Sequence, residues 1–183
     1  MLIRVRPGLE LRSVVDSDAT ELDRLIDANR SRLEPFMPWV AAHTIDATHA
    51  FIRSAIRQEA EDDGFQAVIV ADGELAGVAG FHRVDRANAT TSIGYWLAAG
   101  HEGRGTMTAA VGALIDHAFE AWDLHRVELR IAPHNARSRG LAARLGFQEE
   151  GVLRGAERFG DEYRDLIMHS LLRTDRRASA GPA

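Results

Sequence analysis

The amino-acid sequence predicts an α/β fold with a mixed β-sheet, and three features of the chain support this prediction. Alternating apolar and polar residues, typical of strands, occur near both ends of the chain. Segments with the apolar spacing of helices lie between them. Three strand-like segments in the middle, two of them joined by Asp72-Gly73, are typical of an antiparallel meander.

The first part of the chain is expected to form a strand and then a helix. Leu9–Arg12 alternates apolar and polar residues, and Asp16–Asp18 supply candidate N-caps for the helix after them. The apolar residues on one face of that helix are Ala19, Leu22, Leu25 and Ile26. Residues 29–40 are less regular because prolines interrupt them. An apolar cluster within them can pack as core or line a pocket, and consists of Phe36, Met37 and Trp39.

A second helix and the meander are expected next. The helix begins at Thr44 or Asp46 and ends at Glu61. The residues expected on its buried face are Ala50, Phe51, Ala55 and Ile56. The strands of the meander are expected over residues 65–70, 75–81 and 90–98. Asp72-Gly73 favours a type I′ turn between the first two of these strands.

The last part of the chain is expected to alternate helices and strands. A helix runs from Met107 to about Trp122, and Asn135 caps another, which Gly146 ends. The strands are expected over residues 126–131, 147–153 and 163–172.

Composition limits the functions that are open to the chain. Residues 1–172 are long enough for a single domain, whereas residues 173–183 have little to bury and are expected to be a disordered tail. The net charge is -5 and no stripe of Lys or Arg occurs, so nucleic acid is not an expected partner. The absence of cysteine excludes disulfides and thiolate chemistry. No signal peptide or membrane span is recognisable, so a cytoplasmic protein is expected.

Motifs for several common chemistries are missing from the sequence. None of the eight histidines pairs with another at the ligand spacing of a zinc-binding helix, so no metal is expected. The serine-hydrolase motif Gly-x-Ser-x-Gly and the Gly-Lys-Ser/Thr ending of a nucleoside-triphosphatase loop are also missing. Because hairpins join the strands before the glycine loop, that loop does not open a Rossmann unit.

The stretch His101–Thr108 is the most informative part of the sequence for function. Gly103 and Gly105 lie where a strand-like segment gives way to a helix. Backbone N–H groups of residues 103–107 can therefore cradle a phosphate group at the helix N-terminus. The alternative is that the two glycines only allow a tight turn. We interpret the loop as a pyrophosphate site.

Asn135-Ala136-Arg137-Ser138 is the second informative stretch. Asn135 is expected at the N-cap, with its carbonyl accepting the N–H of Ser138. Considered alone, this segment needs no further role, because the hydroxyl of Ser138 can simply be solvated.

Together these stretches resemble the GNAT superfamily of acyl-CoA-dependent N-acyltransferases. The resemblance rests on Leu9–Arg12, Ile93–Leu97, Glu102–Met107, Asn135-x-x-Ser138 and Leu145-Gly146-Phe147. The segment Phe36-Met37-Pro38-Trp39, with Asn135-x-x-Ser138, narrows it to the branch similar to the RimJ/RimL ribosomal-protein N-terminal acetyltransferases. It implies a mixed, mostly antiparallel central sheet, flanked by helices and splayed at an acetyl-CoA groove.

The resemblance implies acetyl-CoA as cosubstrate and no metal. The residues that it assigns to the acetyl-CoA site are Trp96, Leu97, Ala98, Gly103, Arg104, Gly105, Thr106, Met107 and Asn135. The pyrophosphate is expected on the loop N–H groups, and the pantetheine arm on unpaired backbone groups of residues 96–98. A backbone N–H near Leu97 is expected to stabilise the tetrahedral oxyanion.

Two residues depart from the superfamily pattern. Glu102 stands where Gln or Arg is usual, so its carboxylate has to point away from a pyrophosphate, while its backbone can still donate. Ala142 stands where many members have a tyrosine that protonates the departing thiolate. Similarity to the RimL-like branch instead implies that Ser138 donates a hydrogen bond or proton to the thiolate.

The same resemblance implies a general base and an acceptor site. Glu157 is the expected base, acting through water. An alternative is that Glu157 pairs with Arg158 or another surface arginine, and the acceptor amine can also arrive neutral from solution. The residues expected to contact the acceptor are Phe36, Trp39 and Tyr95.

The expected activity is transfer of an acetyl group from acetyl-CoA to a primary amine by direct attack. The acceptor implied by the resemblance is a protein N-terminal α-amine of the ribosomal-protein type. Two alternatives stay open: a small-molecule amine such as an antibiotic, a toxin or a polyamine, and a non-catalytic acyl-CoA-binding regulatory module. Relatives are often dimers, so a homodimer is expected, with neither nucleic acid nor a membrane as partner.

Overall fold

The computed structural model describes residues 1–179, and within them eight strands form a mixed sheet. The strands are β1 (Leu2–Arg6), β2 (Leu9–Ser13), β3 (Gln66–Ala71), β4 (Glu74–Asp85), β5 (Thr90–Leu97), β6 (Arg126–Ile131), β7 (Gln148–Phe159) and β8 (Glu162–Leu172). Their order is β1-β2-β3-β4-β5-β6-β8-β7. The pairing of β5 with β6 is parallel, whereas β6 with β8 and β7 with β8 are antiparallel. The predicted α/β class with a mixed, mostly antiparallel sheet is confirmed.

Helices lie between groups of these strands, as the sequence predicts. The α-helices are α1 (Ala19–Ala28), α2 (Arg30–Leu33), α3 (Ile45–Ala60), α4 (Thr106–Asp116), α5 (Ala136–Arg144) and α6 (Arg173–Ser179). Short helical turns are η1 (Asp16–Asp18), η2 (Ala99–His101) and the π-helical η3 (His117–Ala121). Helix α6 occupies the first part of the segment expected to be disordered, and residues 180–183 lie outside the described part of the chain.

The chain divides into two compact units. Unit 1 consists of Met1–Arg83 and Gly94–Ala113. Unit 2 consists of Val84–Ile93 and the chain from Leu114 onward. The single domain expected over residues 1–172 therefore stays a prediction.

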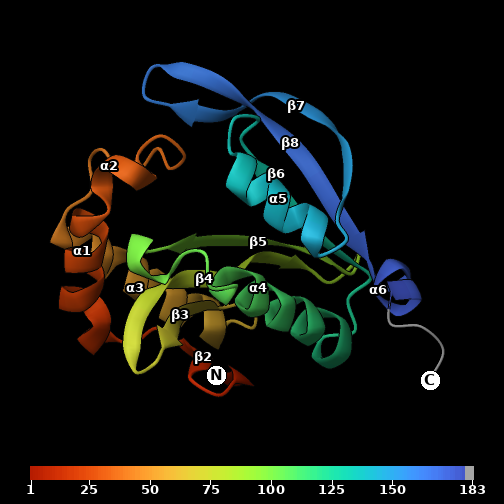
Figure 1. Cartoon of the computed structure of the whole chain (residues 1–183), viewed down its shortest axis with the longest axis horizontal. Helices are drawn as coiled ribbons and strands as arrows, with labels where there is room; N and C mark the ends of the chain where they lie inside the picture. The colour runs from red at the N-terminus through yellow and green to blue at the C-terminus, as the bar shows by residue number, and fades with distance from the viewer. Residues whose placement is uncertain (180–183) are drawn as a thin grey trace. The chain divides into compact units, whose positions relative to one another are not determined.

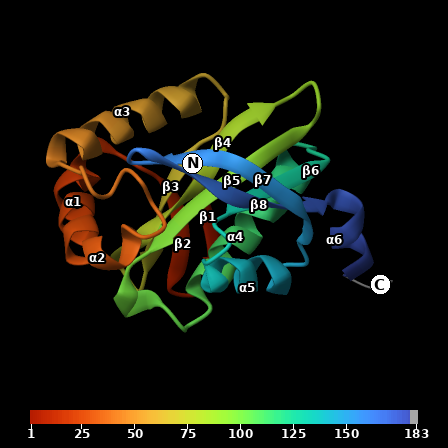
Figure 2. The ribbon, with the colours of Figure 1, turned by 90° about the horizontal axis from the view of Figure 1, so that it is seen from above.

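In unit 1, helices α1 and α3 contact each other and share a core with the strands (Figures 1 and 2). Helix α1 buries Leu22 and Ile26 as predicted. Of the residues expected on the buried face of α3, Ala55 is buried, whereas Ala50 is exposed and Phe51 and Ile56 are 37% and 42% exposed, so the predicted face is wrong in part. The residues that α3 buries are Thr48, Ile52 and Ala55. The face of α3 that lies inward is therefore offset from the predicted one. It includes Thr48, which lies one turn before the buried Ile52.

The β3–β4 hairpin turns where the sequence predicts. Asp72 and Gly73 both have positive φ, 53° and 87°, as a type I′ turn requires. Further along β4, a Cβ at Gly77 would lie 2.2 Å from the carbonyl oxygen of Trp96. Only glycine allows so close an approach of two backbones. This contact positions the carboxyl end of β5, where the candidate site begins.

Unit 2 is built on β6, β8 and the long twisted hairpin that β7 forms with β8 (Figure 1). Both hairpin strands are longer than the predicted segments 147–153 and 163–172. An ionic network ties the strands together. Arg126 donates to both carboxylate oxygens of Glu150 at 2.7 and 2.6 Å, and Ser170 donates to the same carboxylate at 2.7 Å. These bonds lower the pKa of Glu150 to about 2, the arginine being the larger cause.

Candidate active site

The glycine loop of unit 1 adopts a backbone conformation that requires both of its glycines. Gly103 and Gly105 have φ values of 73° and 72°, in the left-handed region that other residues rarely enter. A Cβ at either position would meet no atom within 4 Å, so the backbone conformation, and not space, selects glycine. Thr106, which is buried, begins α4 directly after the loop. The first N–H groups of α4, which have no carbonyl partner within the helix, thus follow a glycine turn. This arrangement is suited to binding an anion.

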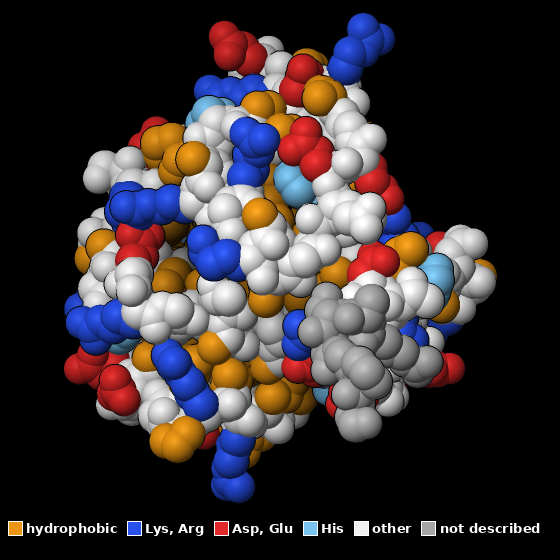
Figure 3. Space-filling model, turned by 45° about the vertical axis from the view of Figure 1, so that its right-hand side comes forward, with side chains coloured by type: hydrophobic (Ala, Val, Ile, Leu, Met, Phe, Trp, Pro, Cys, Tyr) orange, Lys and Arg blue, Asp and Glu red, His pale blue; other side chains and the backbone are white. Residues whose placement is uncertain are grey.

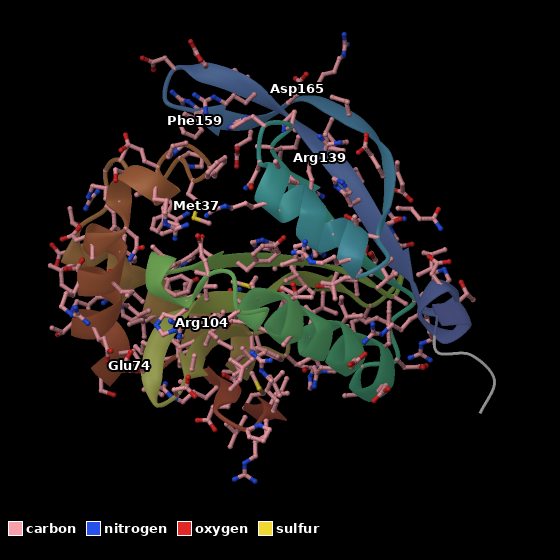
Figure 4. All side chains as sticks on the ribbon, viewed as in Figure 1. Met37, Glu74, Arg104, Arg139, Phe159 and Asp165 are labelled. Carbon is pink, nitrogen blue, oxygen red and sulfur yellow. The ribbon has the colours of Figure 1, made fainter. Side chains whose placement is uncertain are left out.

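Side chains from the first helices and from β1 hold the segment that leads into this loop. Arg32 of α2 donates to the carbonyl oxygen of Leu97 and to the carboxylate of Glu102. Asn29 accepts the N–H of Ala99 at 2.8 Å. Arg6 donates to the carbonyl oxygen of Arg104, which Figure 4 labels in the loop, at 3.3 Å. The carboxylate of Glu102, which departs from the superfamily pattern, is therefore paired with an arginine.

The residues predicted to bind the pantetheine arm lie at the end of β5, and several of their groups already have contacts within the protein. The side chain of Trp96 lies in the hydrophobic core and is 8% exposed. The N–H of Ala98 donates to the carbonyl oxygen of Ala76 at 2.7 Å, and the carbonyl of Leu97 accepts from Arg32. Two of the backbone groups expected to be unpaired for a pantetheine arm therefore already have partners within unit 1.

The residues expected to contact the acceptor also lie in unit 1. The apolar cluster after α2 separates into two environments. Met37 packs against the core, whereas Trp39 is 45% exposed and meets the buried His43 ring edge-on at 5.5 Å. Phe36 and Tyr95 are half-buried. Arg30 fixes the segment by donating to the backbone carbonyls of Val40 and His43.

Unit 2 carries the predicted catalytic serine on α5. The side-chain oxygen of Asn135 accepts the N–H of Ser138 at 3.1 Å, which confirms the predicted N-cap. Ala142 is fully buried, and Ser138 precedes it by four residues on the same helix face. Ser138 is itself half-buried.

Glu157 lies on β7, opposite Arg164 of β8 in the ladder. Burial raises the pKa of its carboxyl, and the charges of Arg164 and His134 lower it by less. Among the side chains that the structure describes, Glu157 forms no ion pair or hydrogen bond. Arg158, the suggested partner, instead donates to the carbonyl of Gly160 and approaches Asp161 at 3.9 Å. A half-buried carboxyl without a fixed partner can exchange a proton.

Unit 2 also contains an open hollow of about 570 Å³. Its lining residues are Pro133, His134, Tyr163, Arg164 and Asp165. Asp165, labelled on β8 in Figure 4, accepts the N–H of Gly155 at 2.8 Å, and Tyr163 is 69% exposed. Two of the lining residues, His134 and Arg164, are the charges that act on Glu157. The hollow is therefore polar and accessible, and it shares two residues with the electrostatic surroundings of Glu157.

Other functional features can be stated for the described part of the chain. Residues 1–179 contain no cluster of three His, Asp or Glu side chains arranged to hold a metal ion. None of the helices described is long and apolar enough to cross a membrane. On the face drawn in Figure 3, basic and acidic side chains are interspersed, so its charge is of mixed sign.

Several residues of the site were not found from the sequence. They are Arg6, Asn29 and Arg32 in unit 1, and His134, Tyr163, Arg164 and Asp165 in unit 2. Asn29 is 8% exposed, and a buried amide needs partners, but burial is not visible in the sequence. Arginines on short helices resemble any solvated charge, so Arg32 carries no recognisable signal.

Comparison with known proteins identifies relatives along nearly the whole chain. Residues 8–148 match the family described as the acetyltransferase (GNAT) domain. A ribosomal-protein-serine acetyltransferase of Escherichia coli (strain K12) is 30% identical over 169 residues, covering 92% of this chain and 94% of the relative.

Two solved structures have the same fold over similar lengths. One is RimL, a ribosomal alpha-N-protein acetyltransferase in complex with coenzyme A, with a TM-score of 0.89 and 26% identity over 94% of this chain and 98% of that chain. The other is the microcin C7 self-immunity acetyltransferase MccE in complex with acetyl-CoA and AMP. Its TM-score is 0.88 and its identity 30%, over 93% of this chain and 95% of that chain.

Proposed function

The chain belongs to the GNAT acetyltransferase family, as an N-acetyltransferase of the RimL/RimJ-like group, and from this premise we propose that it acetylates the α-amine of a protein N-terminus. The donor is acetyl-CoA, which is the ligand of the similar MccE, while the similar RimL binds coenzyme A. The acceptor is inferred from the ribosomal-protein acetyltransferases that resemble this chain over more than 90% of its length.

The observation that carries the donor half of this proposal is the glycine loop. Gly103 and Gly105 take positive φ immediately before α4, so successive backbone N–H groups are available to a diphosphate. The groups that bind the diphosphate belong to the backbone of Gly103–Met107. The pantetheine arm lies along the end of β5, using backbone groups other than the N–H of Ala98 and the carbonyl of Leu97.

The reaction is a direct attack of the neutral amine on the thioester carbonyl carbon. A C–N bond forms, the C–S bond breaks, and the amine loses one proton. Glu157 accepts that proton through water, a role suited to a carboxyl whose pKa is raised by burial. The tetrahedral oxyanion is stabilised by a backbone N–H near Leu97.

Ser138 acts on the leaving group. Its hydroxyl donates a hydrogen bond to the departing thiolate, which then takes a proton from solvent. The N-cap bond from Asn135 to the N–H of Ser138 fixes the first turn of α5 and so orients this serine. The buried Ala142 cannot take this role because it has no polar group.

A small-molecule amine is a second candidate acceptor. It is favoured by the likeness to MccE, which is a self-immunity acetyltransferase crystallised with AMP, and by the open polar hollow in unit 2. A peptide N-terminus and an aminoacylated nucleotide both present a primary amine close to a carbonyl group. The two candidates therefore differ in the group attached beyond that carbonyl, which is a peptide chain in one and a nucleotide in the other.

An acceptor panel tests the proposal. The protein is incubated with acetyl-CoA and peptides with different N-terminal residues, polyamines, or aminoacyl-AMP analogues, and the release of free thiol is measured. The proposal predicts release with unblocked peptides at a kcat/KM at least tenfold above the small amines. Release of thiol with the nucleotide analogues alone would identify a small-molecule amine as the acceptor. Binding of coenzyme A without release in any arm would indicate a regulatory module.

A further inference from the structure

Arg32 joins the end of β5 to the start of the glycine loop through a single guanidinium group. One terminal nitrogen donates to the carbonyl of Leu97 and the other to the carboxylate of Glu102. We propose that the Arg32–Glu102 pair is a positioning device that holds the acetyl-CoA loop in its binding conformation. This inference rests on the proposed function of the loop and adds Arg32, which lies outside the loop.

The chemistry of arginine suits this role. Its planar fork fixes two acceptors at once, which the single ammonium of a lysine does not. The Nε of Arg32 is buried and has no hydrogen-bond partner among the described residues, so the two terminal nitrogens make the attachment. The side chains of Arg32 and Glu102 are only 30% and 27% exposed. Such a pair is less weakened by water than an ion pair on the open surface.

The peptide group between Leu97 and Ala98 is hydrogen-bonded through both its carbonyl and its N–H. The carbonyl of Leu97 accepts from Arg32, and the N–H of Ala98 donates to the carbonyl of Ala76 at 2.7 Å. The next N–H, of Ala99, is held by Asn29, whose own amide nitrogen donates to the carbonyl of Leu25 at 2.8 Å. Every one of these contacts lies within unit 1. The segment from Leu97 to Glu102 thus has little freedom while Arg32 is in place.

The direction in which coenzyme A affinity changes when Glu102 loses its charge distinguishes a positioning role from charge repulsion alone. A carboxylate close to a diphosphate repels it, so removing the charge of Glu102 strengthens coenzyme A binding if repulsion is all that Glu102 contributes. If the carboxylate holds Arg32 and the loop, removing its charge weakens binding instead. Glu102→Gln keeps the size of the side chain and an acceptor oxygen, and therefore tests the sign directly.

The experiment measures coenzyme A binding by calorimetry to the full chain and its variants. Glu102→Gln is expected to raise the Kd about threefold, and Arg32→Ala or Arg32→Lys about tenfold. The double variant Arg32→Ala, Glu102→Gln is expected to bind no more weakly than Arg32→Ala alone, since both changes break one pair. Arg24→Ala, which removes an exposed arginine of α1, is the control and is expected to leave the Kd unchanged. Unchanged or tighter binding by Glu102→Gln overturns the proposal.

A second measurement does not depend on ligand. Amide hydrogen exchange of residues 97–104 in the free protein is expected to be faster in Glu102→Gln than in the native chain, with unchanged exchange in β3. Equal exchange at residues 97–104 overturns the positioning role even if coenzyme A binds. Failure of the native chain to bind coenzyme A, with faster exchange in the variant, contradicts the proposed function and leaves the positioning role supported.

Discussion

Glu157 stands directly opposite Arg164 in the β7–β8 ladder, and burial nevertheless raises the pKa of its carboxyl above the ordinary 4.5. The arginine charge acts in the opposite direction, as does that of His134, and both effects are smaller than desolvation. A base has to be ionised to accept a proton. The balance between burial and these charges therefore sets the pH range in which Glu157 can work.

The first prediction concerns the pH profile. We expect kcat/KM to rise with pH as Glu157 loses its proton, at a pKa above 4.5. Arg164→Gln removes a charge that lowers this pKa and is expected to move the rise to higher pH. Glu157→Gln is expected to lower the rate about 100-fold and to abolish this rise, while ionisation of the acceptor amine remains visible.

The control for this profile is Glu162→Gln, which changes an exposed carboxylate on β8. A Glu157→Gln profile with the native shape and rate would contradict the assignment of the base.

The stability of the protein gives a further check on the raised pKa of Glu157. Because folding raises this pKa, ionisation of Glu157 lowers the free energy of unfolding as pH rises, so Glu157→Gln is expected to be no less stable near neutral pH.

The second prediction separates chemistry from binding at Ser138. Ser138→Ala is expected to lower kcat at least tenfold and to leave the Kd of coenzyme A nearly unchanged, since the hydroxyl acts on the thiolate that forms during the reaction. Steady-state kinetics and calorimetry measure the two quantities. Ser54→Ala, an exposed change on α3, is the control. Native kcat in Ser138→Ala would remove the serine from the mechanism.

The third prediction concerns the two loop glycines. Gly103→Ala and Gly105→Ala each place a Cβ on a backbone with φ near +70°, at a cost of about 1–2 kcal/mol. We expect the KM for acetyl-CoA to rise about tenfold and the melting temperature to fall by only a few degrees, because a cost of about 1–2 kcal/mol is small for a chain of this length. Gly100→Ala is the matched control, since a Cβ there meets open space and its φ is not positive. Equal KM values in all three variants would show that the loop conformation does not matter.

The fourth prediction concerns acid stability. The pKa of Glu150 is lowered to about 2, first by its bonds with Arg126 and then by Ser170. A lowered pKa means that the stabilisation is present above the ordinary value of 4.5 and is lost as pH falls toward 2. In urea unfolding, Glu150→Gln is expected to have a lower free energy of unfolding than the native chain at neutral pH, and this difference is expected to shrink below about pH 4. A difference that stays constant with pH would show that the substitution acts through packing and not through charge.

The parts of the fold predicted best are those fixed by local chemistry. Asp72-Gly73 forms the I′ turn, β6 spans Arg126–Ile131 as predicted, and Asn135 caps α5. Each depends on residues that are neighbours in the sequence. The glycine loop was found for the same reason, because positive φ at Gly103 and Gly105 is a local demand.

The parts that sequence reasoning missed depend on contacts between distant segments. Strand β1 was not predicted, since Leu2–Arg6 becomes a strand by pairing with β2 at the sheet edge. The buried face of α3 was misplaced because Thr48 is accommodated by the ring nitrogen of His43, at 2.9 Å. Arg32 meets Glu102 across 70 positions of the chain, which no local pattern reveals.

The central claim, transfer of an acetyl group to an N-terminal α-amine, is tested most directly by locating the product. The protein is incubated with acetyl-CoA and a lysine-containing peptide with a free N-terminus, and the acetylated position is read by tandem mass spectrometry. The same peptide with a blocked N-terminus is the control. We predict acetylation at the α-amine of the free peptide and none of the blocked one. Acetyl groups on the lysine side chain of both peptides, or on neither peptide while a small amine is consumed, would contradict the account.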